Sequence, residues 1–140
     1  MADTVTPLHI RQLESSDLAD LYEIYSDENT SRYLLSDSWN PDTMQDQFDQ
    51  KLAVNEKDGS ACLAVVKDRK VIGVLSVWKK EMPDTYEIGY VFHKDHRHQG
   101  FASVSLMKVI DDLFMNRKAH RVYAELDHQS GADPFYSRNV

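Results

Sequence analysis

The sequence is poor in features that define several protein classes, and each shortage excludes a class. It contains a single cysteine, Cys62, which rules out an internal disulfide framework. It has no apolar run of about 18 residues, so no transmembrane helix is expected. Residues 1–7 lack the basic start and the apolar centre of a secretory signal. We therefore expect a cytoplasmic protein with no membrane partner.

Positive charge is also in short supply. The 140 residues carry 16 Lys and Arg against 23 Asp and Glu, a formal net charge of −7, which argues against nucleic acid as a partner. The excess of acid lies in residues 1–60, whereas residues 61–140 are slightly basic. The acidic half is suited to line a site for a cationic acceptor such as an amine, although solvated helix faces explain the same charge.

The length fits a single domain, residues 1–140, in which short strands and helices are mixed. Alternating and continuous apolar segments predict strands at residues 8–13, 61–66, 71–78, 85–93 and 121–126. Apolar residues at helical spacing predict helices at residues 18–25, 41–54 and 100–116, and the polar run 26–31 is expected to be irregular. This order of elements predicts an α+β sheet with helices on its faces.

Residues 87–102 combine three local signals that favour an anion site. The predicted strand 85–93 ends, a polar and basic run follows, and Gly100 then precedes a helix. The first backbone N–H groups of a helix have no partner within it and lie at the positive end of its dipole. Because glycine has no Cβ, Gly100 lets an anion approach that backbone closely. The pattern therefore predicts a phosphate at the start of the helix.

The motif Arg97-x-x-Gly100-x-Ala102 carries a resemblance to a known family. It follows Glu-Ile-Gly-Tyr and precedes an amphipathic helix. In that setting it resembles the acetyl-CoA pyrophosphate loop of the GNAT N-acetyltransferase superfamily, in a branch related to ribosomal-protein N-terminal acetyltransferases. The two common glycine motifs for nucleotides, Gly-x-Gly-x-x-Gly and Gly-x-x-x-x-Gly-Lys-Ser/Thr, are absent from the sequence.

The resemblance implies both a fold and an activity. The fold is a GNAT-like, mixed and mostly antiparallel central sheet with helices on both faces. The activity is that of an acetyl-CoA-dependent N-acetyltransferase, in which a primary amine attacks the thioester directly in a ternary complex. The acceptor would be a small-molecule amine or a protein N-terminus.

The same resemblance assigns two groups of residues that bind the cosubstrate. Pantetheine would pair with the backbone of the strand before the loop, at Tyr90, Val91, Phe92 and His93. The pyrophosphate would be held by the loop and the start of the helix, at Arg97, His98, Gln99, Gly100, Phe101 and Ala102. Arg97 would add a charge-assisted contact, and a solvated loop arginine is the alternative.

Direct attack needs a base for the amine and an acid for the departing thiolate. By resemblance, Glu87 is the candidate base, acting through water. A structural glutamate bonded within the sheet is the alternative. Glu125 and His93 are further candidates for the base.

The C-terminal residues supply the candidate acid. The family pattern there is matched at Ala132, Phe135, Tyr136 and Arg138. Tyr136 is the candidate that protonates the thiolate, and a plain packing aromatic is the alternative. Gln129 stands where the family has asparagine and is assigned to cosubstrate binding because it keeps an amide.

The chain departs from the family at its end. It stops at Val140, where the pattern would continue into two more strands, so we expect those strands to be absent. The alternative function is a truncated, catalytically silent module that binds acyl-CoA or pairs with another chain, with a homodimer as one form of pairing. A third interpretation is an unrelated α+β protein whose helix start binds another phosphate or nothing.

The histidines around the loop offer an alternative interpretation as a metal site. His93, His96 and His98 have a spacing that suits zinc. No second set of Cys or His shows ligand spacing, and the loop assignment already explains the region. We therefore expect no metal.

Overall fold

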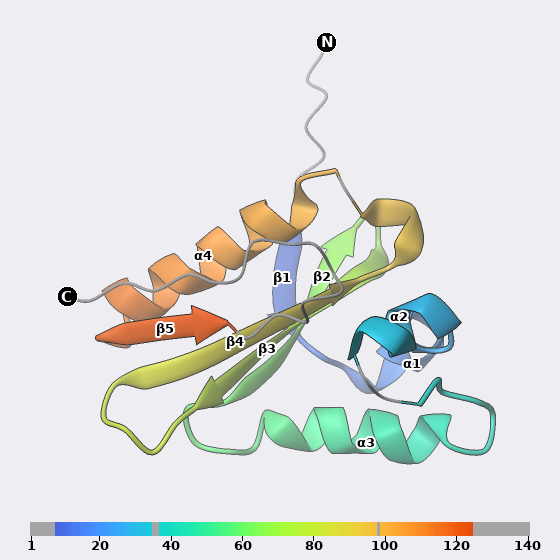
Figure 1. The fold of residues 1–140 in the computed structure, drawn as a ribbon, viewed down its shortest axis with the longest axis horizontal. Helices are drawn as coiled ribbons and strands as arrows, with labels where there is room; N and C mark the ends of the chain where they lie inside the picture. The colour runs from blue at the N-terminus through green and yellow to red at the C-terminus, as the bar shows by residue number, and fades with distance from the viewer. Residues whose placement is uncertain (1–7, 35–36, 98, 125–140) are drawn as a thin grey trace, which may run out of the picture.

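A single mixed sheet forms the centre of the protein (Figure 1). The computed structural model describes residues 8–34, 37–97 and 99–124, and within these residues the sheet has five strands. They are β1 (His9–Gln12), β2 (Ala61–Lys67), β3 (Lys70–Lys79), β4 (Thr85–Phe92) and β5 (Arg121–Ala124). Strands β1 to β4 pair antiparallel in sequence order, and β5 pairs parallel with β4. The predicted mixed, mostly antiparallel α+β sheet is confirmed.

Helices cover both faces of the sheet, as predicted (Figure 1). The helices are α1 (Leu18–Tyr25), α2 (Glu28–Leu34), α3 (Met44–Val54) and α4 (Phe101–Met115). One core lies between α4 and the sheet and includes Leu75, Ile88, Leu106, Val109 and Ile110. The other lies under α1 and α3 and includes Leu21, Ile24, Phe48, Ala64 and Val74. Burial of these apolar faces on a shared sheet is what stabilises the helices.

Helix α2 was not predicted, because residues 26–31 are polar. Two polar side chains form its buried face: Thr30 is 1% exposed and Ser31 is 5% exposed. The carboxylate of Asp27 accepts hydrogen bonds from the backbone N–H and the hydroxyl of Thr30, each at 2.9 Å. These bonds satisfy donors in the first turn of the helix. The prediction of an irregular segment was therefore wrong.

The connection from β4 through α4 returns the chain to the same edge of the sheet, where β5 pairs parallel with the first half of β4. The two strands pair from Thr85 with Arg121 to Ile88 with Ala124. Strand β4 continues to Phe92, beyond this last described pair. The course of the chain after Ala124, including any divergence from β4 and any further strands, lies outside the described residues.

A buried ion pair fixes β1 to the start of α1. Asp17 ends the short helix η1 (Ser15–Asp17) and is 4% exposed. Its carboxylate accepts two hydrogen bonds from the Arg11 guanidinium, at 2.8 and 2.9 Å, and one from the N–H of Glu14 at 2.8 Å. Burial acts to raise the pKa of Asp17, but these donors outweigh it and hold the pKa below its usual range.

Replacing Asp17 by asparagine should lower the free energy of unfolding at neutral pH by about 2 to 3 kcal/mol, because Arg11 loses its buried partner. Since folding lowers the pKa of Asp17, its contribution is complete above the unfolded-state pKa of about 4 and is lost as the pH falls through the folded-state value. Urea unfolding at a series of pH values measures both effects. The matched control is Asp111→Asn on the exposed side of α4, and an equal loss in both variants would contradict the prediction.

Candidate functional site

The start of α4 is open to an anion. Gly100 is the N-cap and has φ 82° and ψ −1°, a left-handed conformation that favours glycine. No side chain caps this helix in the described structure, and no acidic residue lies in its first turn. A Cβ added at Gly100 would meet nothing within 4 Å. The N–H groups of the first turn therefore keep their capacity to bind an anion.

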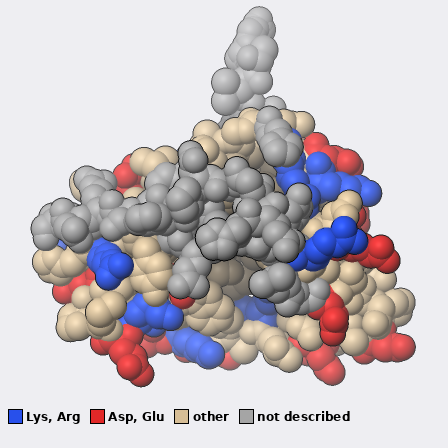
Figure 2. Space-filling model, in the orientation of Figure 1, with Lys and Arg blue, Asp and Glu red and all other residues tan. Residues whose placement is uncertain are grey.

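Basic side chains lie in and beside the turn between β4 and α4, next to acidic ones. Figure 2 shows Lys and Arg side chains gathered at the upper right, where Figure 1 places this turn. The turn contains Lys94 and Arg97, and the short helix η2 (Lys94–His96) lies within it. Because acidic residues lie beside these cations, the positive end of the α4 dipole is what favours an anion here.

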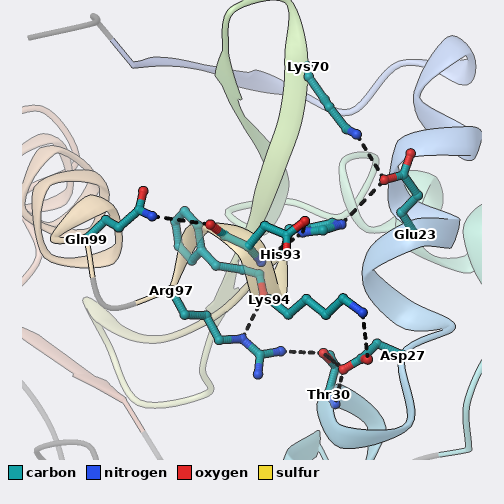
Figure 3. A network of polar contacts seen from close by, with 10 residues as sticks. Glu23, Asp27, Thr30, Lys70, His93, Lys94, Arg97 and Gln99 are labelled. Carbon is teal, nitrogen blue, oxygen red and sulfur yellow. Dashed lines mark hydrogen bonds and ion pairs between the residues drawn. The ribbon is translucent and has the colours of Figure 1, made fainter.

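Side chains of α1, of α2 and of the link between them make polar contacts with this turn (Figure 3). Glu23 on α1 forms ion pairs with Lys70 at 2.9 Å and with the Nε2 of His93 at 3.4 Å. The hydrogen bond from Lys70 and the charge of its ammonium lower the pKa of Glu23 against the opposing effect of burial. Asp27, which links α1 to α2, lies 4.0 Å from the ammonium of Lys94. The acidic residues of the N-terminal half thus pair with basic residues of the turn.

Arg97 forms the most direct link between the turn and α2. Its Nε donates to the carbonyl of Phe92 at 3.1 Å, and its Nη2 donates to the hydroxyl of Thr30 (Figure 3). The guanidinium is therefore directed at α2 and the end of β4. A contact of Arg97 with pyrophosphate stays a prediction.

The residues assigned to pantetheine occupy both faces of β4. Tyr90 and Phe92 pack toward α4, with ring centroids 6.4 Å apart, and Val91 packs toward the other core. His93 is 7% exposed, and its Nδ1 accepts a hydrogen bond from the N–H of Asp95 at 3.1 Å. Since these side chains are engaged in the fold, the strand would offer a ligand mainly its backbone.

The remaining assigned residues are divided between described and undescribed parts of the chain. Phe101 and Ala102 pack against the core under α4, and the side chain of Gln99 donates to the carbonyl of Asp95 at 3.2 Å. His98, Gln129 and Tyr136 lie outside the described residues, as does Glu125. Their roles stay predictions.

Glu87 lies on β4, on the face that α1 and α3 cover. Its neighbours Tyr86 and Ile88 are in the core on the opposite face, and side chains alternate along a strand. Its carboxylate is 24% exposed and pairs with the ammonium of Lys80 at 3.2 Å. Trp78 on β3 stands directly across from it. The structure thus places Glu87 at a half-buried position with one basic partner.

Two cavities lined by described residues lie on opposite faces of the sheet. One of about 480 Å³ lies between β1, β2 and α4, with Leu8, Leu63 and Val109 in its wall. The other, of about 400 Å³, lies between α3 and β3, and its wall includes Trp78. Only the smaller of the two shares a face of the sheet with Glu87. The sequence did not indicate it, because its walls come from segments far apart in the chain.

Neither a metal-ligand cluster nor a membrane-spanning helix is found among the described residues. They contain no group of three His, Cys, Asp or Glu side chains placed to hold a metal ion. His93 and His96 lie with ring centroids 5.9 Å apart, and burial lowers the pKa of His96. In the same part of the chain, no helix has the length and apolar character needed to cross a bilayer.

Comparison with known proteins decides the family. Residues 8–130 match the model of the acetyltransferase (GNAT) domain. The chain belongs to the GNAT acetyltransferase family. The predicted N-acetyltransferase is thereby confirmed at the level of the family, whereas the branch and the acceptor stay predictions.

Individual GNAT relatives agree with this assignment. The chain is 29% identical over 125 residues to the uncharacterized N-acetyltransferase YnaD of Bacillus subtilis (strain 168), covering 86% of this chain and 70% of the relative. Its fold resembles a GNAT acetyltransferase from Bacillus anthracis, with TM-score 0.71, 22% identity, and coverage of 84% and 68% of the two chains. It also resembles spermidine N-acetyltransferase from Vibrio cholerae, solved with CoA and spermine, with TM-score 0.73, 17% identity, and coverage of 89% and 73%.

Thr30→Val tests whether α2 holds the turn of this GNAT domain. The change keeps the shape of a fully buried side chain but removes the hydroxyl that accepts from Arg97. We expect a loss of about 1 to 2 kcal/mol in unfolding free energy and faster amide exchange in residues 94–99. Hydrogen–deuterium exchange measures the second effect.

The conservative control is Thr30→Ser, which keeps the hydroxyl and should retain most of the protection. Equal exchange in the two variants would show that the hydroxyl does not hold the turn.

Proposed function

We propose that this chain transfers an acetyl group from acetyl-CoA to a primary amine, by direct attack of the amine in a ternary complex. The observation that carries the proposal is the uncapped start of α4 at Gly100, which one turn joins to the end of β4. An anion site at the helix start suits the diphosphate of acetyl-CoA, and residues 89–92 of β4, which lie beyond its last described pair with β5, suit its pantetheine arm. The family to which the chain belongs supports the same reaction.

In this proposal two parts of the backbone hold the cosubstrate. Its diphosphate is bound by the N–H groups at Gly100, Phe101 and Ala102. Its pantetheine arm pairs with the backbone of Tyr90, Val91, Phe92 and His93, as an added strand does. A strand rises about 3.3 Å per residue, so Glu87 stands about 20 Å along the chain from His93. An extended arm held at the loop would reach that part of β4.

Glu87 is the proposed base. A protonated amine cannot attack a carbonyl, so it must first lose a proton, which Glu87 accepts through a water molecule. The amine nitrogen then forms a bond to the thioester carbonyl carbon, the carbon–sulfur bond breaks, and the nitrogen loses its second proton to water as the neutral amide forms. The departing thiolate takes a proton, for which Tyr136 remains the proposed donor. Positioning of the two substrates supplies much of the rate.

A silent binding module is the second candidate, and the ion pair between Glu87 and Lys80 favours it. A glutamate that serves only the sheet would make the same contact. The two candidates differ in turnover and agree in binding of acetyl-CoA, so binding and turnover are measured separately.

Gly100→Glu tests the anion site. A carboxylate beside the first N–H groups of α4 competes with the diphosphate and repels it, so calorimetric binding of acetyl-CoA should weaken by at least about 100-fold. Met115→Glu places the same side chain at the other end of α4, where residue 115 is 72% exposed, and should bind normally. Unchanged binding in a folded Gly100→Glu variant would refute the assignment of the loop.

Glu87→Gln tests the base. Turnover of any accepted amine should fall by about 100-fold through kcat, with little change in acetyl-CoA affinity, because only the proton acceptor is lost. Glu81→Gln, an exposed position before β4, is the matched control. A small effect on kcat would leave Glu87 as a structural partner of Lys80 and would favour Glu125 or His93.

A further inference from the structure

The cavity between α3 and the sheet has a polar wall. Besides Ala53, Val54 and Cys62, its wall consists of polar or amphipathic side chains: Gln47, Gln50, Lys51, Lys57, Ser76 and Trp78. Its volume is about 400 Å³, which suits a small ligand or the end of a larger one. None of the residues in this wall is Asp or Glu, which is unexpected in a half of the chain that is rich in both.

Two lysines of this wall have no acidic partner among the described residues. The Nζ of Lys51 lies 4.5 Å from the ring centroid of Tyr25, and the Nζ of Lys57 lies 5.7 Å from that of Trp78. No carboxylate of the described residues lies within ion-pair distance of either ammonium. Burial lowers the pKa of Lys51, against a smaller opposing effect of Cys62.

An anion in the cavity would stabilise the charged forms of both lysines. Aromatic rings stabilise an ammonium only weakly compared with a carboxylate in the same place. A carboxylate within reach of Lys51 and Lys57 would favour their charged forms and could accept from the amides of Gln47 or Gln50. The wall is thus complementary to a negative group and repels a polycation.

The cavity adjoins the proposed base. In the register of β3 with β4, Trp78 stands across from Glu87, and Ser76 stands across from Gly89. Directly opposed side chains on one face of a sheet have Cβ atoms about 5 Å apart. An acceptor with its amine at Glu87 therefore has the cavity beside it, on the same face of the sheet.

We propose that this cavity binds a carboxylate of the acceptor, so that the preferred substrates are amines that also carry a negative group. The inference rests on the proposed function and narrows its substrate class. It sets this chain apart from a polyamine acetyltransferase, such as the spermidine N-acetyltransferase whose fold it shares.

Matched amines test the charge preference. 5-Aminovalerate, pentylamine and cadaverine share a chain of five carbons, and its far carbon is a carboxylate, a methyl group or a methylene that bears a second ammonium, respectively. We expect kcat/KM to be at least about tenfold higher for aminovalerate than for cadaverine, with pentylamine between them. The peptides Ala-Glu-Glu and Ala-Lys-Lys extend the comparison to a protein N-terminus as the source of the amine.

Lysine variants test the site. Lys51→Gln and Lys57→Gln should each raise KM for aminovalerate by about tenfold, with kcat and the kinetics of cadaverine little changed. Lys57 is exposed, so its variant keeps the test valid if loss of the half-buried Lys51 impairs folding. Lys108→Gln makes the same charge change on α4, at the other cavity on the opposite face, and should behave like the unmodified chain.

A binding measurement separates this inference from the proposed function. Calorimetry with glutarate, in the presence of CoA, requires no turnover. Saturable binding of glutarate that Lys57→Gln weakens supports the anion site, even if no amine is acetylated. Turnover that favours cadaverine, or that is unaffected by both lysine variants, overturns the inference and leaves the acetyltransferase intact. Absence of glutarate binding by a folded chain that binds acetyl-CoA also overturns it.

Discussion

The hydrogen bonds of Arg97 hold together the parts on which the candidate site depends. The guanidinium joins the carbonyl of Phe92, at the end of β4, to the hydroxyl of Thr30 on α2. Gly100 follows three residues later and begins α4, so the position of the helix start depends on this link. The strand edge, the anion site and the helices over the other face of the sheet are therefore held in one arrangement. A shift of α2 would be transmitted directly to the turn.

The distribution of charge has a different meaning in the folded chain than along the sequence. Glu23 and Asp27 belong to the acidic half, but they pair with Lys70, His93 and Lys94 and so stabilise the turn. Such contacts are partly exposed and individually weak; together they fix its position. These acids are therefore already paired with protein cations and are less available to a cationic acceptor. By contrast, the two lysines in the wall of the cavity between α3 and β3 have no described carboxylate within ion-pair distance.

Local sequence patterns predicted most of the fold, but they missed the helix whose buried side chains are polar. The strands and three of the helices follow from hydrophobic periodicity, which needs only neighbouring residues. Helix α2 was missed because Thr30 and Ser31 form its buried face, and their hydroxyls are satisfied by partners that no periodicity reveals. The spacing of Asp27 and Thr30, typical of a capped first turn, is the signal that would have found it.

By itself, the sequence determined the order of elements, the family motif and the glycine at the start of α4, because each depends on residues adjacent in the chain. Only the tertiary structure decided that Arg97 is directed at α2 and that Glu87 faces Lys80 and Trp78. It also decided that a cavity lies beside Glu87 in which two lysines contact aromatic rings and no described carboxylate. These contacts join segments separated by many residues. Which side chains meet there is set by strand register and helix packing, and neither can be deduced from local spacing.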